Sequence, residues 1–132
     1  MIVQLDIDGT IDRAPEFFRW LTAALRRDGH KVCIVSSRTH SEENQRTTAD
    51  ELAGLGVAYD RLVLSPDPRV FAYQRLPADF NPAYNVYAGK LLAAQEFGAG
   101  ILFDDCGVTA EIFRKHLPQV TVFRLLPPLP KR

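Results

Sequence analysis

Acidic side chains stand where an apolar strand-like run ends, close to the start of the chain. Asp6 and Asp8 directly follow the run 1–5, which has the composition of a buried strand. An ionised carboxylate left unpaired in such surroundings costs roughly several kcal/mol, so it usually faces a cation or hydrogen-bond donors. A second acidic pair, Asp104 and Asp105, follows another apolar run. We therefore expect these four side chains to serve chemistry and not packing.

Four carboxylates gathered in one crevice would repel one another. Each pair at about 4 Å contributes roughly 4 kcal/mol of repulsion at an effective dielectric constant of about 20. A multivalent cation is the natural counter-charge. Because the available donors are carboxylate oxygens, Mg²⁺ is the expected ion.

Small hydroxyls and a lysine extend this polar set. Ser36 and Ser37 end the apolar run 31–35, and Lys90 stands at the first turn of an expected helix. A cation at that position faces the positive end of the helix macrodipole, which is mildly unfavourable unless an anion lies nearby. A phosphoryl group between Lys90, a serine hydroxyl and a metal would supply that anion. The residues leave open which of the two serines binds it.

The elements that must position these side chains follow an α/β rhythm. We expect strands over 2–5, 31–35, 61–64, 100–103 and 120–125. We expect helices over 15–28, from Ser41 to the glycines at 54 and 56, over 90–97 and over 109–117. The strands lack polar alternation, which is typical of a parallel sheet covered on both faces. The pattern predicts an α/β fold, a three-layer sandwich around a mainly parallel five-stranded sheet, and places the polar signals at its ligand-binding carboxyl edge.

The first two helices are expected to differ in how they pack. The apolar residues of the first recur at helical spacing and should form a stripe against the sheet: Phe17, Trp20, Leu21, Ala24 and Leu25. The second holds few large apolar residues and should be peripheral.

The segment 66–89 departs from the rhythm, because it holds four prolines and five aromatic residues. So long a connection is either a functional loop or the place of a short element that the pattern does not reveal. Its tyrosines, Tyr73, Tyr84 and Tyr87, either stack on a base or pack the loop, and packing is favoured. The tail 127–132 is expected to be a plain polyproline-type terminus.

Composition limits the class of protein. The 132 residues, 46% of them hydrophobic, suffice for one core, so a single domain over 1–132 is expected. Sixteen basic and sixteen acidic residues cancel, which gives no electrostatic argument for a nucleic-acid or membrane partner. With no apolar run near the roughly 20 residues that span a bilayer, we expect a cytoplasmic protein. Cys33 and Cys106 are expected to be reduced.

In these residues the chain resembles the haloacid dehalogenase (HAD) superfamily of phosphotransferases over essentially its whole length. Leu5-Asp6-Ile7-Asp8-Gly9-Thr10 is similar to its first motif and Ile34-Val35-Ser36 to its second. Lys90 corresponds to the third motif and Ile101-Leu102-Phe103-Asp104-Asp105 to the fourth. The first and last are the specific ones.

The resemblance implies a Rossmann-like fold and a phosphatase mechanism. Asp6 would attack phosphorus and form an aspartyl-phosphate, with Asp8 as general acid and base. Mg²⁺ would be held by Asp6, the Asp8 carbonyl, Asp104 and Asp105. The expected phosphate-binding set is Ser36 or Ser37, Lys90, Gly9 and Thr10. Aspartate at position 8 is typical of the members that hydrolyse phosphate esters.

The chain leaves little room for a cap domain, because 11–14 is short and 66–89 is smaller than the usual cap. An open site suits an extended or macromolecular substrate, or closure by a second subunit in a homodimer. A nucleotide, a sugar phosphate and a phosphorylated macromolecule all stay open as substrates.

Plainer interpretations exist for each signal. Asp6 and Asp8 could cap a turn, Asp104 and Asp105 could cap the following helix, and Lys90 could be solvated. Arg38 and His40 lie either against a substrate or in a solvated loop. The alternative function is a non-catalytic metal- and phosphate-binding regulatory protein. A two-component receiver domain would carry its acceptor aspartate in mid-chain, which this order does not match.

Overall fold

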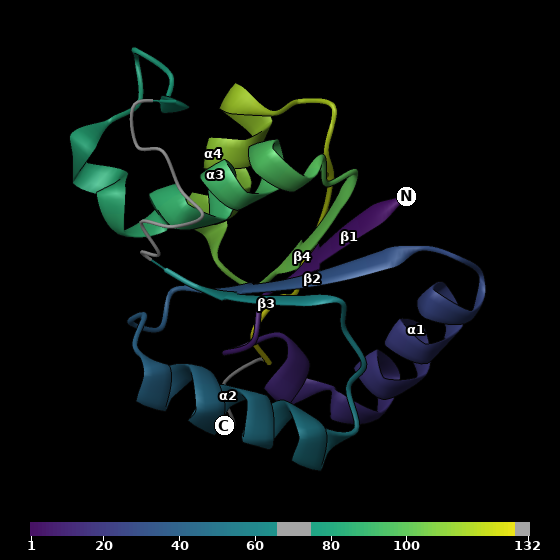
Figure 1. Cartoon of the computed structure of the whole chain (residues 1–132). Helices are drawn as coiled ribbons and strands as arrows, with labels where there is room; N and C mark the ends of the chain where they lie inside the picture. Colours follow the sequence, from purple (N-terminus) through teal and green to yellow (C-terminus); the bar gives the residue numbers. More distant parts are fainter. Residues whose placement is uncertain (66–74, 129–132) are drawn as a thin grey trace.

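A computed structural model describes residues 1–65 and 75–128 (Figure 1). Its strands are β1 (Ile2–Leu5), β2 (Lys31–Ser36), β3 (Arg61–Leu64), β4 (Ile101–Asp104) and β5 (Thr121–Arg124). They pair in the order β3-β2-β1-β4-β5, and every pairing is parallel. This confirms the predicted α/β fold with a five-stranded sheet.

Helices cover both faces of the sheet. The α-helices of the described residues are α1 (Pro15–Arg27), α2 (Glu42–Leu55), α3 (Ala88–Phe97) and α4 (Gly107–His116). Short 3₁₀ helices are η1 (Ile11–Arg13) and η3 (Pro82–Tyr87). Figure 1 shows α1 and α2 on one side of the sheet and α3 and α4 on the other. None of the described helices is long and apolar enough to cross a membrane.

The ends of α2 follow the signals in its sequence. Ser41 is its N-cap, and the hydroxyl oxygen accepts a hydrogen bond from the Asn44 amide at 3.0 Å. Gly56 ends the helix in the left-handed region at φ +73°, which glycine adopts without steric cost. Only Thr48 and Leu52 of this helix are buried, as expected of a peripheral helix.

Each face of the sheet has its own core. On the α1 and α2 side, Val3 and Leu5 of β1 pack with Phe18 and Leu52. On the α3 and α4 side, the core is built around Leu91, Leu102, Ile112 and Phe113. Burial on both faces explains why the strands read as continuous apolar runs.

The predicted stripe of α1 is wrong in part. Phe18 and Thr22 are the buried residues of the helix, whereas Phe17 and Trp20 are 46% and 64% exposed. Leu21 and Leu25 do pack against the core. The Phe17 ring lies 6.5 Å from that of Phe103 on β4 and still stays exposed, so this side of α1 lies at the margin of the core.

The segment 66–89 contains a short element that its composition did not reveal. Asn81 caps η3 by accepting a hydrogen bond from the Ala83 amide at 3.0 Å, and η3 leads directly into α3. Tyr87 packs against the core, and its ring lies 6.3 Å from that of Tyr84. The predictions for 66–74, with Tyr73, and for 129–132 of the tail lie outside the described residues.

Candidate active site

Two carboxylates come from the ends of adjacent strands. Asp6 follows β1 directly, and Asp104 is the last residue of β4. The register pairs Leu5 with Phe103, and the Asp6 amide donates to the Phe103 carbonyl at 3.0 Å. The parallel pairing therefore holds residues far apart in the sequence at one edge of the sheet.

Lys90 lies between these carboxylates. Its Nζ is 3.1 Å from Asp6 Oδ1 and 2.7 Å from Asp104 Oδ2, and only 6% of its side chain is exposed. Gln4 on β1 donates to the Lys90 carbonyl at 3.1 Å and so fixes the first turn of α3 against the strand. Lys90 is thus a buried ion-pair partner and not a solvated surface residue.

The third acidic residue, Asp105, completes a cluster. Asp6, Asp104 and Asp105 each offer one oxygen, and these atoms lie within 4.8 Å of one another. Asp104 Oδ1 also accepts from the Cys106 amide at 2.9 Å, just before α4. Cys106 is the N-cap of α4, so Asp104 orders the turn before that helix as well as pairing with Lys90.

The charges in this cluster do not balance. Burial raises the pKa of Asp6 to about 7; the Lys90 charge acts against this, and the Asp104 charge adds to it. Burial alone would lower the pKa of Lys90, but Asp6 and Asp104 outweigh it and raise that pKa. One ammonium thus faces two buried carboxylates with a third beside them. Closely spaced carboxylate oxygens whose negative charge is not fully compensated are suitable ligands for a hard divalent cation.

Gly9 makes room for Asp105. It adopts φ +82°, and a Cβ built there would lie 2.1 Å from Asp105 Oδ2. The Gly9 amide donates to Asp12 Oδ1 at 2.8 Å, and the Thr10 hydroxyl donates to Asp6 Oδ2 at 3.3 Å. The turn after β1 therefore packs against Asp105 and is hydrogen-bonded to Asp6 of the acidic cluster.

Asp8 is not one of the three carboxylates of this cluster, and its side chain pairs with an arginine. Its side chain is 61% exposed, and both carboxylate oxygens accept from Arg38: Oδ2 from Nε at 3.0 Å and Oδ1 from Nη2 at 2.8 Å. The hydrogen bonds from Arg38 are the main cause that lowers the pKa of Asp8. Asp8 is consequently in the ionised form, which accepts a proton.

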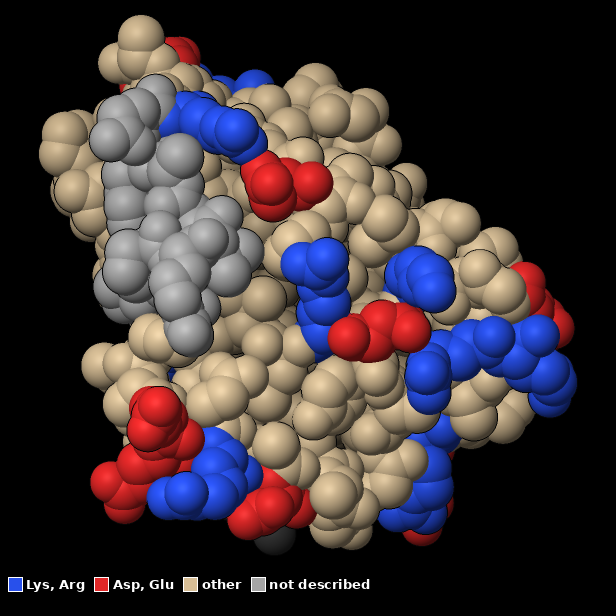
Figure 2. Space-filling model, viewed as in Figure 1, with Lys and Arg blue, Asp and Glu red and all other residues tan. Residues whose placement is uncertain are grey.

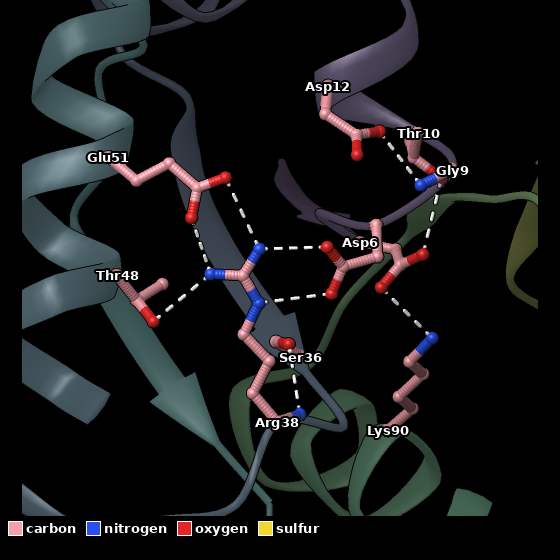
Figure 3. A network of polar contacts seen from close by, with 10 residues as sticks. Asp6, Gly9, Thr10, Asp12, Ser36, Arg38, Thr48, Glu51 and Lys90 are labelled. Atoms are coloured by element: carbon pink, nitrogen blue, oxygen red, sulfur yellow. Dashed lines mark hydrogen bonds and ion pairs between the residues drawn. The ribbon is translucent and has the colours of Figure 1, made fainter.

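The other side of Arg38 contacts α2, as Figure 3 shows. Nη1 lies 2.6 Å from Glu51 Oε2 and 3.3 Å from the Thr48 hydroxyl, and Nη2 lies 3.3 Å from Glu51 Oε1. No sequence signal points to Glu51, because nothing in the helical pattern of α2 sets it apart from the other acidic residues of that helix. Arg38, for which the sequence leaves substrate contact and a solvated loop both open, is engaged by the protein itself.

The two candidate serines have different surroundings. Ser36 is buried at the end of β2, and its Oγ accepts from the Arg38 amide at 3.1 Å, which leaves the hydroxyl proton available for another acceptor. Ser37 is exposed. Of the pair, Ser36 has the fixed position that a binding hydroxyl needs.

Two cavities among the described residues lie away from the acidic cluster. A cavity of about 440 Å³ lies between η3 and the end of α4, lined by residues such as Phe80, Tyr84 and His116. Another of about 450 Å³ includes Cys33, Arg61 and Phe97. Neither includes a residue of the acidic cluster. On the face seen in Figure 2, acidic and basic side chains lie next to one another without a large area of one sign.

Comparisons with known proteins support the fold. No protein-family model and no curated protein matches the chain. A chain of the Pnkp1/Rnl/Hen1 complex is similar in structure, with a TM-score of 0.60 and 17% identity, over 95% of this chain and 45% of that one. An uncharacterized protein from Corynebacterium glutamicum ATCC 13032 Kitasato has a TM-score of 0.61 and 16% identity, over 96% of this chain and 85% of that one. The chain thus spans less than half the length of the first of these structures, and both share its α/β fold.

Proposed function

We propose that this protein is a Mg²⁺-dependent phosphatase of the type found in the HAD superfamily, which hydrolyses a phosphate monoester through an aspartyl-phosphate. One observation carries the proposal: the buried carboxylates of Asp6 and Asp104 meet Lys90 at the ends of adjacent parallel strands. Buried charge without full compensation costs stability, and such sites are commonly functional.

The acidic cluster supplies the ligands for the metal. Asp6, Asp104 and Asp105 offer the oxygens that the structure brings together, and the resemblance adds the Asp8 carbonyl. Bound Mg²⁺ would neutralise phosphoryl charge as it develops. Lys90 and the free hydroxyl proton of Ser36 would bind phosphoryl oxygens from the protein side.

Asp6 and Asp8 divide the covalent chemistry. An Asp6 oxygen attacks phosphorus, the ester P–O bond breaks, and the leaving alkoxide takes a proton from Asp8. Water then attacks the aspartyl-phosphate while Asp8 accepts its proton, which releases inorganic phosphate and restores Asp6. The ionised Asp8 of the structure matches the second step. Before the first step Asp8 must take up a proton, and a monoester bound as its monoanion supplies it to Asp8, since the second phosphate pKa is about 6.

The surroundings of the site bear on substrate size. Between β1 and α1 the chain forms only the short helix η1. A site of this kind accommodates either a small phosphate ester or the end of a larger phosphorylated molecule, and a second copy of the chain could cover it. Within this proposal the substrate is defined by its phosphate monoester group.

The decisive experiment replaces the nucleophile. Asp6→Asn should abolish Mg²⁺-dependent phosphate release from a panel of nucleotides, sugar phosphates and phenyl phosphate, because an amide cannot form the aspartyl-phosphate. Asp50→Asn makes the same chemical change at an exposed position of α2 and should keep wild-type turnover. Phosphate release is measured at equal folded concentration, with and without chelator.

Two results would count against the proposal. An Asp6→Asn variant with wild-type turnover would remove Asp6 as the nucleophile. Tight Mg²⁺ binding by the wild type without turnover on any ester would instead support the regulatory alternative.

A further inference from the structure

The guanidinium of Arg38 is shared by two carboxylates from different parts of the chain. Asp8 lies on the turn after β1. Glu51 lies on α2 (Figure 3). Both contacts have two N–H donors directed at one carboxylate, since Nη2 also reaches Glu51 Oε1. A planar fork of this kind fixes the orientation of its partners better than a single contact does.

The charge balance argues against Arg38 as a receptor for substrate phosphate. Its single positive charge already faces two carboxylates, and only 25% of its side chain is exposed. An anion would have to compete with these two carboxylates for the N–H donors of Arg38. Its contacts are those of a residue that holds other residues in place.

Asp8 is the residue that needs such support. It is the most exposed of the acidic residues assigned to the site, and Arg38 is the side-chain partner that the structure gives it. A proton-transfer group must be held within hydrogen-bond reach of its target, and a displacement of about 1 Å can cost on the order of 100-fold in rate. Glu51 and Thr48 keep the guanidinium from following Asp8 into solvent.

We propose that Arg38 and Glu51 are positioning residues, in which Glu51 orients the guanidinium of Arg38 and Arg38 orients the Asp8 carboxylate for proton transfer. The catalytic consequence depends on the proposed phosphatase function, whereas the coupling between Arg38 and Asp8 does not. It gives α2, a helix with two buried residues, a direct role at the site.

The first test separates positioning from substrate binding with phenyl phosphate as the probe. Arg38→Lys keeps the charge but loses the fork, so kcat should fall about 10- to 100-fold. KM should stay within about twofold, because Asp8 acts mainly in the transition state. Glu51→Gln should lower kcat in the same direction by a smaller factor. Asp50→Asn, one residue earlier on the same helix, is the matched control and should leave both constants unchanged.

A large rise in KM with kcat unchanged would show instead that Arg38 binds the substrate, and would overturn the proposal.

The second test is a double-mutant cycle. In an Asp8→Asn background, Arg38→Lys should change kcat by less than about twofold, since its effect passes through Asp8. A full additional loss in that background would also overturn the proposal.

The same cycle measured by urea unfolding needs no substrate. Asp8→Asn and Arg38→Lys should show a non-additive effect on the unfolding free energy. Additive effects of the two substitutions on the unfolding free energy would show that Arg38 and Asp8 are not coupled, and would overturn the proposal. Non-additive effects in a protein that hydrolyses no ester would refute the phosphatase function and still uphold the coupling, so the two failures are distinguishable.

Discussion

At the scale of single residues, Gly9 is constrained by both its backbone and its neighbour. It combines a left-handed φ of +82° with a carboxylate oxygen 2.1 Å from the place of a Cβ. An L-residue there would have to displace Asp105, which belongs to the acidic cluster. A glycine at position 9 therefore allows Asp105, a candidate metal ligand, to keep its position.

Gly9→Ala should destabilise the fold by about 1–2 kcal/mol or more, because a left-handed backbone is costly for alanine and Asp105 must move. Urea unfolding measures the loss, and isothermal titration should show weaker Mg²⁺ binding. Gly54→Ala is the control: Gly54 lies in α2, a Cβ added there would meet no atom within 4 Å, and the variant should gain roughly 0.5–1 kcal/mol. Equal effects at both positions would contradict this account of Gly9.

The raised pKa of the buried Asp6 has a consequence for stability. Its pKa is about 7 in the folded protein against 3.8 in the unfolded chain, so the folded state binds the proton more tightly. The resulting stabilisation is complete below about pH 4 and is lost as the pH rises through about 7. Without metal, the wild type should therefore become less stable over this range.

Asp6→Asn removes this titration and one negative charge beside Lys90. The variant should lose less stability than the wild type between about pH 5 and pH 8 in urea unfolding without metal. Added Mg²⁺ should stabilise the wild type more than the variant at about pH 8. Parallel stability curves for the two proteins would rule out a raised pKa at Asp6.

At the scale of elements, the strands and most helix ends could be predicted from the sequence. Short apolar runs mark the strands, and Ser41 and Gly56 mark the ends of α2. The buried face of α1 could not be predicted in full, because it depends on how the helix lies across the sheet. The short helix η3 was hidden by a proline- and aromatic-rich composition that also suits a loop.

The candidate site also contains residues that could be predicted from the sequence and one that could not. The acidic residues and Lys90 stand at strand ends or a helix start, and a parallel sheet brings such positions to one edge. Glu51 could not be predicted, since its contact with Arg38 depends on how a helix of ordinary sequence lies beside a turn. Sequence patterns identify the ends of elements better than the faces of peripheral helices.

The packing of α1 predicts opposite outcomes for two aromatic residues. Phe18→Ala should cost about 3–5 kcal/mol, because Phe18 is 1% exposed and packs in the core. Trp20→Ala, at a residue 64% exposed, should change stability by about 0.5 kcal/mol or less. Thermal or urea unfolding compares the two, and a greater loss from Trp20→Ala would mean that the helix presents its other face to the sheet.

At the scale of the whole molecule, the order β3-β2-β1-β4-β5 determines where the acidic cluster forms. The chain extends the sheet in one direction from β1 through β2 to β3, and then returns to place β4 and β5 on the other side. Ligands of open parallel sheets bind where this direction reverses, which here is between β1 and β4. Asp6 and Asp104 occupy the two sides of that point.

The central place of β1 also sets the order of events during synthesis. Its pairing with β2 becomes available after a single α-helix, but its other edge pairs with β4, which holds residues 101–104. A ribosome adding about 5–20 residues per second leaves that edge without its partner for several seconds, until β4 has emerged. A nascent chain therefore exposes its innermost strand to chaperones and to other unfinished chains, and the acidic cluster is assembled only once both flanking strands are out of the ribosome.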